Sequence, residues 1–373
     1  MLNHSIPAVD VLIPAYNAER TLASSIQSIQ DQSVRDIRII VVNDGSTDRT
    51  GELLRAIAAD DARVFVINTP NRGIVEALNL ALEHSDAPII ARHDADDMAF
   101  PDRFTRQLAY LNANPDCLAV GAEVFQISDD GRRIGRTHFT REGPPNPTAL
   151  PAVEPYLLHP FLMVRGEALR AAGGYRHVLH AEDADLYWRL LSRGRLHNMP
   201  DLLGEYRIHA GSITSASVHR GRVGSAYAEL AALSFRRRET GRADIDFPAD
   251  ALTRVENLRS MDEVLDYLSR QLTVEEREHF RLAAAIKLLL NASYRPYQLE
   301  VDDARFIAAA KPALIRRLDH RGRAKLLRWY AGVLLKMLRA RRFAELRALE
   351  APVAAYAQLA PMLARRVLNR LRA

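Results

Sequence analysis

Cysteine is nearly absent from this sequence, because Cys117 is the only one among 373 residues. A single thiol cannot form an internal disulfide, and it leaves no zinc site built from cysteines. No stretch reaches the roughly 18 apolar residues that a membrane-spanning helix needs, and Met1–Val9 lacks the basic and apolar regions of a secretory signal. We therefore expect a cytoplasmic protein that is soluble or peripherally bound at the inner face of the cell membrane.

The charge of the chain is distributed unevenly. The net charge is +5, but the segment from Lys311 to the end holds 16 basic and 3 acidic residues, which leaves −8 for the 310 residues before it. A nucleic-acid interface needs its basic side chains on the domain that carries the recognition motifs. The charge pattern therefore argues against nucleic acid as a partner and assigns the basic character to the C-terminal region.

Strand and helix patterns alternate over roughly the first 210 residues, which is typical of βαβ units and a largely parallel sheet. The expected strands are Val9–Ile13, Ile37–Val42, Val64–Ile67 and Ile89–Ala91, and the expected helices are Ala18–Gln30, Thr50–Ala59 and Gly73–Glu83. After a Pro-rich loop at 143–147 come an apolar run at Leu157–Val164, helices near Glu167–Ala172 and Asp183–Arg193, and a strand at Leu202–Arg207. We predict the α/β fold class.

Each of the first four expected strands ends in a polar, turn-rich segment. These segments are Pro14–Asn17, Asn43–Ser46, Asn68–Gly73 and His93–Asp97. In open α/β folds, ligands bind outside the carboxyl ends of the strands. We therefore expect the four segments to converge on one edge of the sheet and to form the functional site there.

An acidic cluster, Asp94-Ala95-Asp96-Asp97, follows the fourth strand. Carboxylates packed together repel one another unless a cation or protons relieve them. Oxygen ligands of this kind suit Mn²⁺ or Mg²⁺, which proteins hold with few carboxylates together with substrate phosphates. The alternative is that these acids cap or flank the helical segment that follows, because an Asp-x-Asp pattern is common.

The other polar residues are weaker indicators when each is taken alone. Asp44 is equally suited to cap a helix, Arg72 to be a solvated loop arginine, and Tyr16-Asn17 to form a simple turn. Their position at successive strand ends is what makes them candidates.

Later candidates have similar alternatives. Asp183, beside Glu182, is also suited to cap the following helix. His209 follows the last expected strand, where its setting suggests a loop facing a ligand or phosphate, whereas an isolated histidine is more often structural. His93 and His159 are interpreted as structural residues or as supports of the site.

Taken in order, these segments resemble glycosyltransferase family 2, the inverting enzymes of the GT-A fold that assemble bacterial surface polysaccharides and glycolipids. The residues that carry the resemblance are Ile13–Asn17, Val42–Asp48, Asn71–Gly73 with Ala77 and Asn79, Asp94–Asp97, His159–Met163, Gly173–Tyr175, Glu182-Asp183 and Tyr206–His209. Eight ordered matches across about 200 residues are a specific signal. The resemblance implies a Rossmann-like catalytic domain and a metal-dependent hexosyltransferase.

The resemblance also implies roles for the donor side. Pro14, Ala15, Tyr16 and Asn17 would line the nucleotide pocket, Asp44 would accept a hydrogen bond from the base, Arg72 would approach the base, and Asp94 with Ala95 would contact the ribose or sugar. Asp96 and His209 would hold Mn²⁺ or Mg²⁺. The donor would be a nucleoside-diphosphate sugar, with UDP expected and dTDP or GDP as alternatives.

For the acceptor side, the resemblance implies that Asp183 is the general base, with Glu182 beside it. The acceptor would be a sugar or a lipid-linked glycan. Two features depart from the common pattern: His93 stands where an apolar residue is usual, and Trp188 is one place away from the expected aromatic position, so that we interpret it as a core residue.

The chain is predicted to consist of a catalytic domain at 1–216, with nucleotide-sugar binding at about 1–125 and the acceptor part at about 126–216, and a helical region at 217–373. Its last segment, Leu359–Leu371, has one broad apolar face and basic side chains that suit an anionic membrane surface. The alternative is a helical bundle with a solvated basic face. A homo-oligomer is compatible with the sequence.

Two other functions compete with sugar transfer. A nucleotidyltransferase would also use clustered aspartates with Mg²⁺, but it should carry a basic, Gly-rich loop where this chain has Pro14–Ala18. A non-catalytic nucleotide-sugar-binding scaffold would not need both Asp96 and Asp183.

Overall fold

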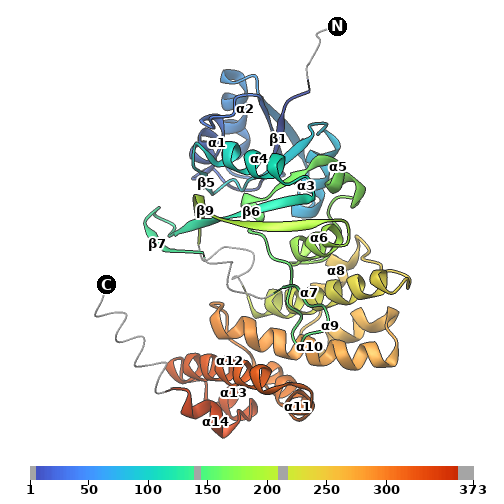
Figure 1. Ribbon diagram of the computed structural model, residues 1–373. Coiled ribbons are helices and arrows are strands. Elements are labelled where there is room, and N and C mark those ends of the chain that lie inside the picture. The colour runs from blue at the N-terminus through green and yellow to red at the C-terminus, as the bar shows by residue number, and fades with distance from the viewer. Residues whose placement is uncertain (1–5, 138–143, 209–216, 360–373) are drawn as a thin grey trace. The chain divides into compact units, whose positions relative to one another are not determined.

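The computed structural model describes residues 6–137, 144–208 and 217–359. The chain forms two compact units. The sheet unit comprises Met1–Pro144, Pro155–His177 and Glu182–His209, and the helical unit comprises Pro145–Glu154, Val178–Ala181 and Ala210–Ala373. In Figure 1 the labelled strands all belong to the sheet unit, and the helical unit carries labels for helices only. Two short segments of the helical unit thus come from within the range that we predict as catalytic.

The sheet unit begins with four parallel strands in the order β3-β2-β1-β4. They are β1 (Val9–Ala15), β2 (Ile37–Asp44), β3 (Val64–Thr69) and β4 (Ile89–Arg92), and the helices between them are α1 (Leu22–Gln30), α2 (Thr50–Asp60) and α3 (Ile74–Glu83). All of the predicted strands and helices of this part are present. Helix α1 starts at Leu22, four residues later than predicted.

The second half of the sheet is more mixed in direction. Its strands and helices are β5 (Met98–Ala99), α4 (Arg103–Ala113), β6 (Cys117–Ile127), β7 (Arg133–Arg136), η2 (His159–Phe161), β8 (Met163–Arg165), α5 (Gly166–Ala171), α6 (Glu182–Leu191) and β9 (Arg195–Arg207). Strand β8 pairs antiparallel with β4 and with β6, whereas β9 runs parallel to β6. The predicted α/β class is confirmed, and the parallel arrangement is clearest in the first four strands.

Both faces of the sheet are covered, which explains why its central strands are apolar on both sides. Val9, Val11 and Ile13 of β1 point into one core with residues of α1, α2 and α4, and Leu12 points into the other with residues of α3, α5 and α6. Trp188 in α6 is fully buried, as predicted for a core residue.

The helical unit contains α7 (Val218–Glu239), α8 (Ala251–Val255), α9 (Met261–Leu268), η3 (Ser269–Gln271), α10 (Val274–Tyr294), α11 (Val301–Arg317), α12 (His320–Arg339), α13 (Phe343–Ala348) and α14 (Val353–Ala357). Helix α10 packs on α7, α11 and α12. Its first turn is fixed by a capping box between Thr273 and Glu276, which satisfies two backbone N–H groups.

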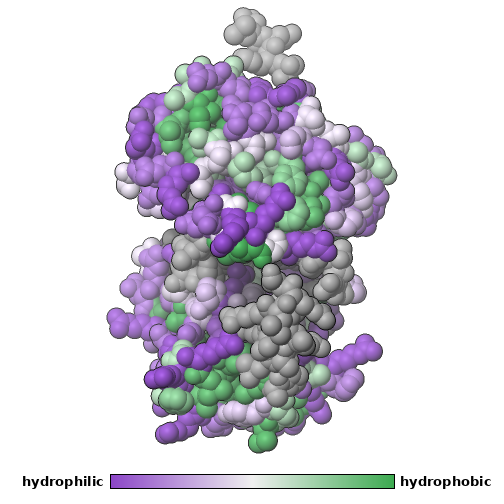
Figure 2. Space-filling model, turned by 90° about the vertical axis from the view of Figure 1, so that its left-hand side faces the viewer, coloured by the Kyte–Doolittle hydropathy of each residue, from purple (hydrophilic) through white to green (hydrophobic). Residues whose placement is uncertain are grey.

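The surface is polar over most of the face in Figure 2, and the apolar areas are separate patches in both units. Among the residues that the structure describes, no helix combines the length and the apolarity needed to cross a bilayer. The segment Leu359–Leu371, predicted as an amphipathic basic helix, lies almost entirely outside the described residues.

Candidate active site

The loops that follow β1 and β2 are joined by side chain to backbone hydrogen bonds. The backbone N–H of Asn17 donates to Ser46 Oγ at 3.0 Å, and the N–H of Thr47 donates to Asn17 Oδ1 at 2.8 Å. Asn17 has a φ of 48°, a left-handed conformation that asparagine tolerates better than most residues. Tyr16 beside it is 53% exposed and leaves an aromatic face open to solvent at the strand end.

Asp44, at the end of β2, fixes the loop that follows β3. Its carboxylate accepts the backbone N–H of Arg72 at 2.8 Å and that of Gly73 at 2.9 Å, and Asp44 is nearly buried. Gly45 next to it has a φ of 68°, and a Cβ there would lie 2.4 Å from the Asn71 nitrogen, so that only glycine lets the loops approach so closely. The structure thus brings Asp44 and Arg72 together, and the role of Asp44 toward a base stays a prediction.

The acidic cluster lies directly beyond β4. One carboxylate oxygen each from Asp94, Asp96 and Asp97 lies within 4.8 Å of the others, and Asp97 is fully buried. Burial, followed by the charges of Asp94 and Asp96, raises the pKa of Asp97 well above its usual range. The mutual repulsion expected from the sequence is therefore present in the fold.

Two helix α1 side chains hold the cluster's backbone in place. The hydroxyl of Ser25 donates to the Asp94 carbonyl at 2.7 Å, and the hydroxyl of Thr21, at the start of the helix, donates to the Ala95 carbonyl at 2.9 Å. The loop carrying the carboxylates is thereby anchored to the sheet unit's core rather than left free.

Arg207, at the end of β9, supports the cluster from the other side and was not anticipated as a site residue. Its backbone N–H donates to Asp97 Oδ1 at 2.8 Å, and its Nε donates to the Asp96 carbonyl at 3.0 Å. Asp97 Oδ2 is buried and has no hydrogen-bond partner among the described residues. Three convergent carboxylates and an unpaired buried oxygen fit a divalent cation such as Mn²⁺ or Mg²⁺. His209, the other predicted metal ligand, lies outside the described residues.

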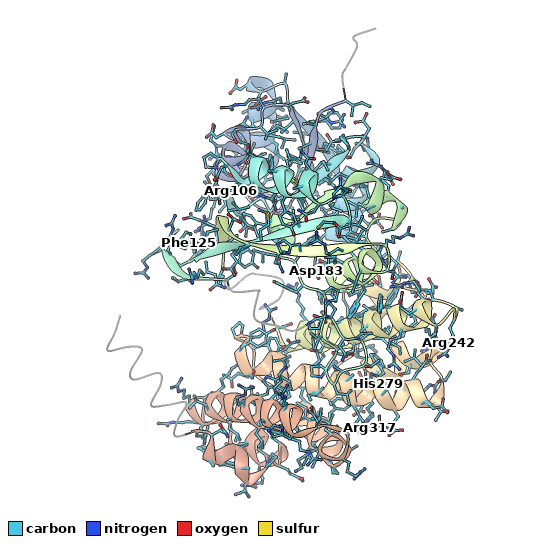
Figure 3. The ribbon with its side chains drawn as sticks, in the orientation of Figure 1. Arg106, Phe125, Asp183, Arg242, His279 and Arg317 are labelled. Atoms are coloured by element: carbon cyan, nitrogen blue, oxygen red, sulfur yellow. The ribbon has the colours of Figure 1, made fainter. Side chains whose placement is uncertain are left out.

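Glu182 and Asp183 form the first turn of α6, where Figure 3 labels Asp183. Burial and the neighbouring Asp183 charge raise the pKa of Glu182 to about 8, and the charge of Asp94 adds to this effect. Asp183 Oδ1 also accepts the N–H of Ala184 at 2.7 Å, and Asp183 is the second residue of α6 rather than its N-cap. The structure brings the pair within electrostatic reach of Asp94.

A third acidic residue of α6, Asp185, forms ion pairs that hold the helix in the sheet unit. It is fully buried and forms ion pairs with Arg176 and Arg189, at 2.8 Å to the latter. Arg189 also donates to the Gly174 carbonyl at 2.7 Å. Asp185 is therefore satisfied within the fold, and the acids before it remain at the half-buried start of the helix.

Asn79 explains one of the sequence matches. From α3, its side-chain amide donates to the Tyr175 carbonyl at 2.9 Å and accepts the Tyr175 N–H at 2.8 Å. The Tyr175 hydroxyl lies 2.9 Å from His159 Nε2. This chain of contacts ties the Gly173–Tyr175 loop, which precedes α6, to the first half of the sheet unit.

The two uncertain histidines are internal residues. Burial is the largest cause that lowers the pKa of His93 and of His159 well below the usual range, so that both are neutral. His93 Nδ1 lies 3.3 Å from Nη1 of the buried Arg103, and His159 contacts Tyr175. Both are therefore buried within the sheet unit, which agrees with their interpretation as structural residues, and a supporting role at the site stays a prediction.

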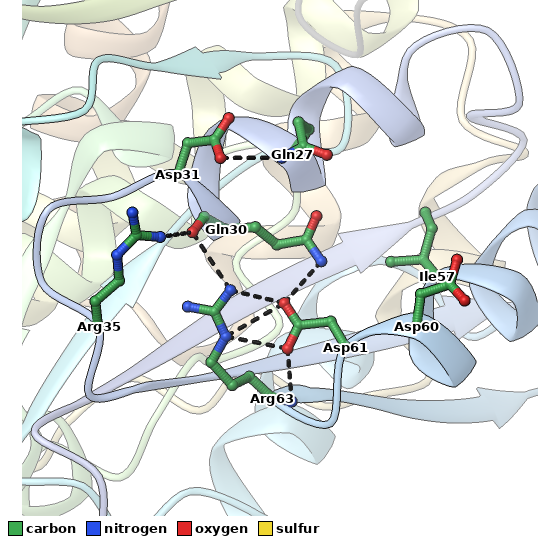
Figure 4. A pocket seen from close by; sticks show the side chains of 8 residues that line it. All are labelled: Gln27, Gln30, Asp31, Arg35, Ile57, Asp60, Asp61 and Arg63. Carbon is green, nitrogen blue, oxygen red and sulfur yellow. Dashed lines mark hydrogen bonds and ion pairs between the residues drawn. The ribbon is translucent and has the colours of Figure 1, made fainter.

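A separate surface pocket of about 420 Å³ lies at the ends of α1 and α2, near the amino ends of β2 and β3 (Figure 4). Arg63 there is paired with Asp61 at 2.7 Å, and Arg35 donates to the Gln30 carbonyl at 2.8 Å. Ligands of open α/β sheets bind at the opposite, carboxyl ends of the strands. This pocket is therefore not the candidate active site.

Known proteins resemble part of this chain. The profile of glycosyl transferase family 2 matches residues 10–171. The putative glycosyltransferase EpsE of Bacillus subtilis is 34% identical over 210 residues, which cover 55% of this chain and 74% of EpsE. The amylovoran biosynthesis glycosyltransferase AmsE of Erwinia amylovora is 30% identical over 210 residues, which cover 54% of this chain and 76% of AmsE.

A solved structure extends the likeness to the fold as a whole. The mannosyltransferase PcManGT from Pyrobaculum calidifontis, determined in complex with GDP-Man and Mn²⁺, matches with a TM-score of 0.51 at 18% identity. The match covers 95% of this chain and 88% of that one. At this level of identity the likeness concerns the fold.

Proposed function

The chain belongs to glycosyl transferase family 2, and from this premise we propose that it moves a sugar from a nucleoside-diphosphate sugar, with UDP as the expected nucleotide, to an acceptor hydroxyl. The observation that carries the proposal is the presence of two separate clusters of acidic side chains. Asp94, Asp96 and Asp97 converge beyond β4, and Glu182 with Asp183 begins α6. The first cluster is suited to bind the cation of the donor diphosphate, and the second is suited to take the proton of the acceptor hydroxyl.

On the donor side, the exposed ring of Tyr16 and the loop of Arg72, which Asp44 fixes, offer a base and ribose pocket with Pro14, Ala15 and Asn17. Asp94 and Ala95 face the ribose or sugar. Asp96, with His209, would hold Mn²⁺ or Mg²⁺, which stabilises the negative charge left on the diphosphate when the anomeric bond breaks. The buried Asp97 keeps the loop in shape by accepting the Arg207 N–H.

On the acceptor side, Asp183 takes the proton of the attacking hydroxyl, because a hydroxyl is a poor nucleophile at neutral pH. The new bond forms to the anomeric carbon from the side opposite the diphosphate, which inverts that centre in one displacement. Glu182, whose pKa is raised to about 8, keeps a proton near neutral pH and leaves the negative charge on Asp183.

The acceptor that we propose is a growing polysaccharide or a lipid-linked glycan. AmsE acts, by its name, in amylovoran biosynthesis, and it is 30% identical to this chain over 210 residues. A lipid-linked acceptor would place the enzyme at the inner face of the cell membrane.

The test is release of nucleoside diphosphate and transfer of sugar, measured with UDP-, GDP- and dTDP-sugars in the presence of Mn²⁺, Mg²⁺ or a chelator. We expect turnover only with a divalent cation, and loss of both turnover and Mn²⁺ binding in Asp96→Ala. Asp60→Ala, which removes an exposed carboxylate from the same unit, is the matched control and should behave as the wild type. Transfer of a nucleotidyl group, or binding of donor without any transfer, would replace sugar transfer by one of its two competitors.

Membrane contact is a separate part of the proposal. In the described chain, α12 exposes Arg321, Arg323, Lys325 and Arg328, and basic side chains close to an anionic surface each contribute about 1 kcal/mol to binding. We expect sedimentation with vesicles that contain phosphatidylglycerol at low salt, release at high salt, and no sedimentation with phosphatidylcholine alone. Equal recovery with both vesicles would contradict membrane contact and leave sugar transfer untouched.

A further inference from the structure

Arg92 is the last residue of β4 and lies two residues before Asp94. Its backbone N–H donates to the Leu162 carbonyl at 2.9 Å, and its carbonyl accepts Nη2 of Arg103 at 2.8 Å. The residue is only 3% exposed. The backbone on both sides is thus fixed, and the guanidinium is a positive charge buried within the sheet unit.

The guanidinium of Arg92 is incompletely satisfied. Its Nη2 lies 2.5 Å from Asp94 Oδ1, whereas Nε and Nη1 are buried and have no hydrogen-bond partner among the described residues. Donors without partners are costly inside a protein, because they give up hydrogen bonds to water without replacement. A buried arginine that keeps unpaired N–H donors beside Asp94 therefore indicates a functional role rather than a purely structural one.

The charge of Arg92 reaches both halves of the active site. On the donor side it pairs with Asp94. On the acceptor side it is among the groups that lower the pKa of Glu182 and the pKa of Tyr175, which rests on His159. Arg103, the other buried arginine nearby, is engaged with backbone carbonyls and with the Phe161 ring, 4.6 Å from its guanidinium.

We propose that Arg92 is a positioning residue that joins the donor and acceptor halves of the site: it holds Asp94 in place and stabilises the anionic form of the Glu182–Asp183 pair. The inference rests on the proposed sugar transfer. Arg92 offsets part of the repulsion among these carboxylates, because this buried cation pairs with Asp94 and its charge also acts on Glu182.

The groups that face Glu182 define what should happen when Arg92 is neutralised. The charges that act on the pKa of Glu182 are Asp183 on α6 and Arg92 and Asp94 on or beyond β4. Tyr175, in the loop before α6, is subject to Glu182, Arg92 and also Arg189. Among the charges that act on Glu182 itself, Arg92 is the cation. Its removal should therefore raise the pKa of the pair, and the base should become available only at higher pH.

The test compares Arg92→Met and Arg92→Lys with wild type in the pH profile of kcat/KM. In Arg92→Met we expect the acidic limb to move up by about one pH unit or more, and in Arg92→Lys, which keeps the charge, we expect it to stay near wild type. Arg165→Met is the matched control. This half-buried arginine of the same unit donates to the backbone carbonyls of Cys117 and Leu111, and its loss should lower thermal stability without moving the limb.

Arg92→Gln replaces the Met variant should that variant fail to fold. A second readout, independent of turnover, is the ¹³C NMR titration of the Glu182 carboxyl, assigned with Glu182→Gln. An upward move of that titration in the neutral variants supports the proposal. If the wild type transfers sugar but neither the acidic limb of kcat/KM nor the Glu182 titration moves in the neutral variants, the proposal is overturned. If the wild type transfers no sugar, the proposed function is overturned instead.

Discussion

The acidic cluster of the sheet unit and the Arg222–Asp303 pair of the helical unit arrange charge in opposite ways. In the sheet unit, Asp94, Asp96 and Asp97 bring like charges together. In the helical unit, buried charges of opposite sign are matched: Arg222 Nε lies 2.6 Å from Asp303 Oδ1, with side chains 4% and 0% exposed. The cluster therefore carries an electrostatic cost, whereas the pair stabilises the fold, as Asp185 with Arg189 does in the sheet unit.

The difference between clustered like charges and matched ion pairs helps to identify functional residues. Like charges that are buried together raise the free energy of the folded protein, so that they indicate a ligand of opposite charge or a shared proton. Matched pairs such as Arg237 and Glu276, 2.6 Å apart, indicate structure. By this criterion the cluster of Asp94, Asp96 and Asp97 is the candidate for chemistry, and Arg237 with Glu276 is a structural pair.

The largest effect should come from Asp183, the proposed base. Asp183→Asn keeps the size of the side chain but removes its ability to take a proton, so that we expect kcat to fall by about 10²–10⁴ while donor binding stays within a few-fold. Glu182→Gln should cost less, because Glu182 carries a proton near neutral pH, as its pKa of about 8 implies. Steady-state kinetics with measured donor affinity check both.

Asp185→Asn is the control within the same helix. Asp185 is paired with Arg176 and Arg189 inside the fold, so that its replacement should lower the free energy of unfolding by about 3–5 kcal/mol. Equal losses of stability in Asp183→Asn and Asp185→Asn would remove the distinction between the reacting and the structural acid.

The second effect concerns the matched charges of the helical unit. Arg222→Met leaves Asp303 buried without its partner and should destabilise that unit by about 3–5 kcal/mol. The double variant Arg222→Met/Asp303→Leu should recover part of this loss, because no uncompensated buried charge remains. Chemical unfolding followed by circular dichroism measures both. A double variant as unstable as the single one would show that packing, rather than charge, dominates here.

Sequence patterns predicted that the segments after the first four strands converge, because neighbouring strand ends share one edge of a parallel sheet. The four polar segments meet there, and Asp94, Asp96 and Asp97 cluster as predicted. Strand β6 (Cys117–Ile127) was not anticipated, and β9 begins at Arg195 rather than at Leu202. Both belong to long-range pairings, which local periodicity does not report.

Residues that act through their partners were missed for a similar reason. Arg92 and Arg207 read as ordinary charged residues in a sequence, and only the fold shows the first buried beside Asp94 and the second bound to Asp97. Asp183 and Asp185 have the same chemical type two positions apart. The geometry of the helix directs Asp185 toward Arg189, whereas Asp183 remains half-buried in the first turn.

The third effect depends on pH. Burial raises the pKa of Glu229, in α7, to about 7, and its Oε1 has no partner among the described residues. Because the folded pKa lies above the ordinary value of 4.5, the contribution of Glu229 to stability is present below pH 4.5 and is lost as the pH rises through 7.

Glu229→Gln removes that loss. The difference in Tm between the variant and wild type should therefore be small at pH 4.5 and should favour the variant increasingly up to pH 8. Thermal unfolding at a series of pH values measures it. A difference that does not change with pH would show that Glu229 is already ionised in the folded protein.

The smallest effect comes from two adjacent aspartates in α11. Asp303 is buried against Arg222, whereas Asp302 pairs with Arg305 at 3.2 Å with side chains 72% and 69% exposed. Water and salt screen an exposed pair, so that Arg305→Gln should change the free energy of unfolding by less than about 0.5 kcal/mol. The same unfolding measurement that reports on Arg222→Met checks this value. A loss in Arg305→Gln as large as in Arg222→Met would mean that burial is not what separates structural charge pairs from incidental ones.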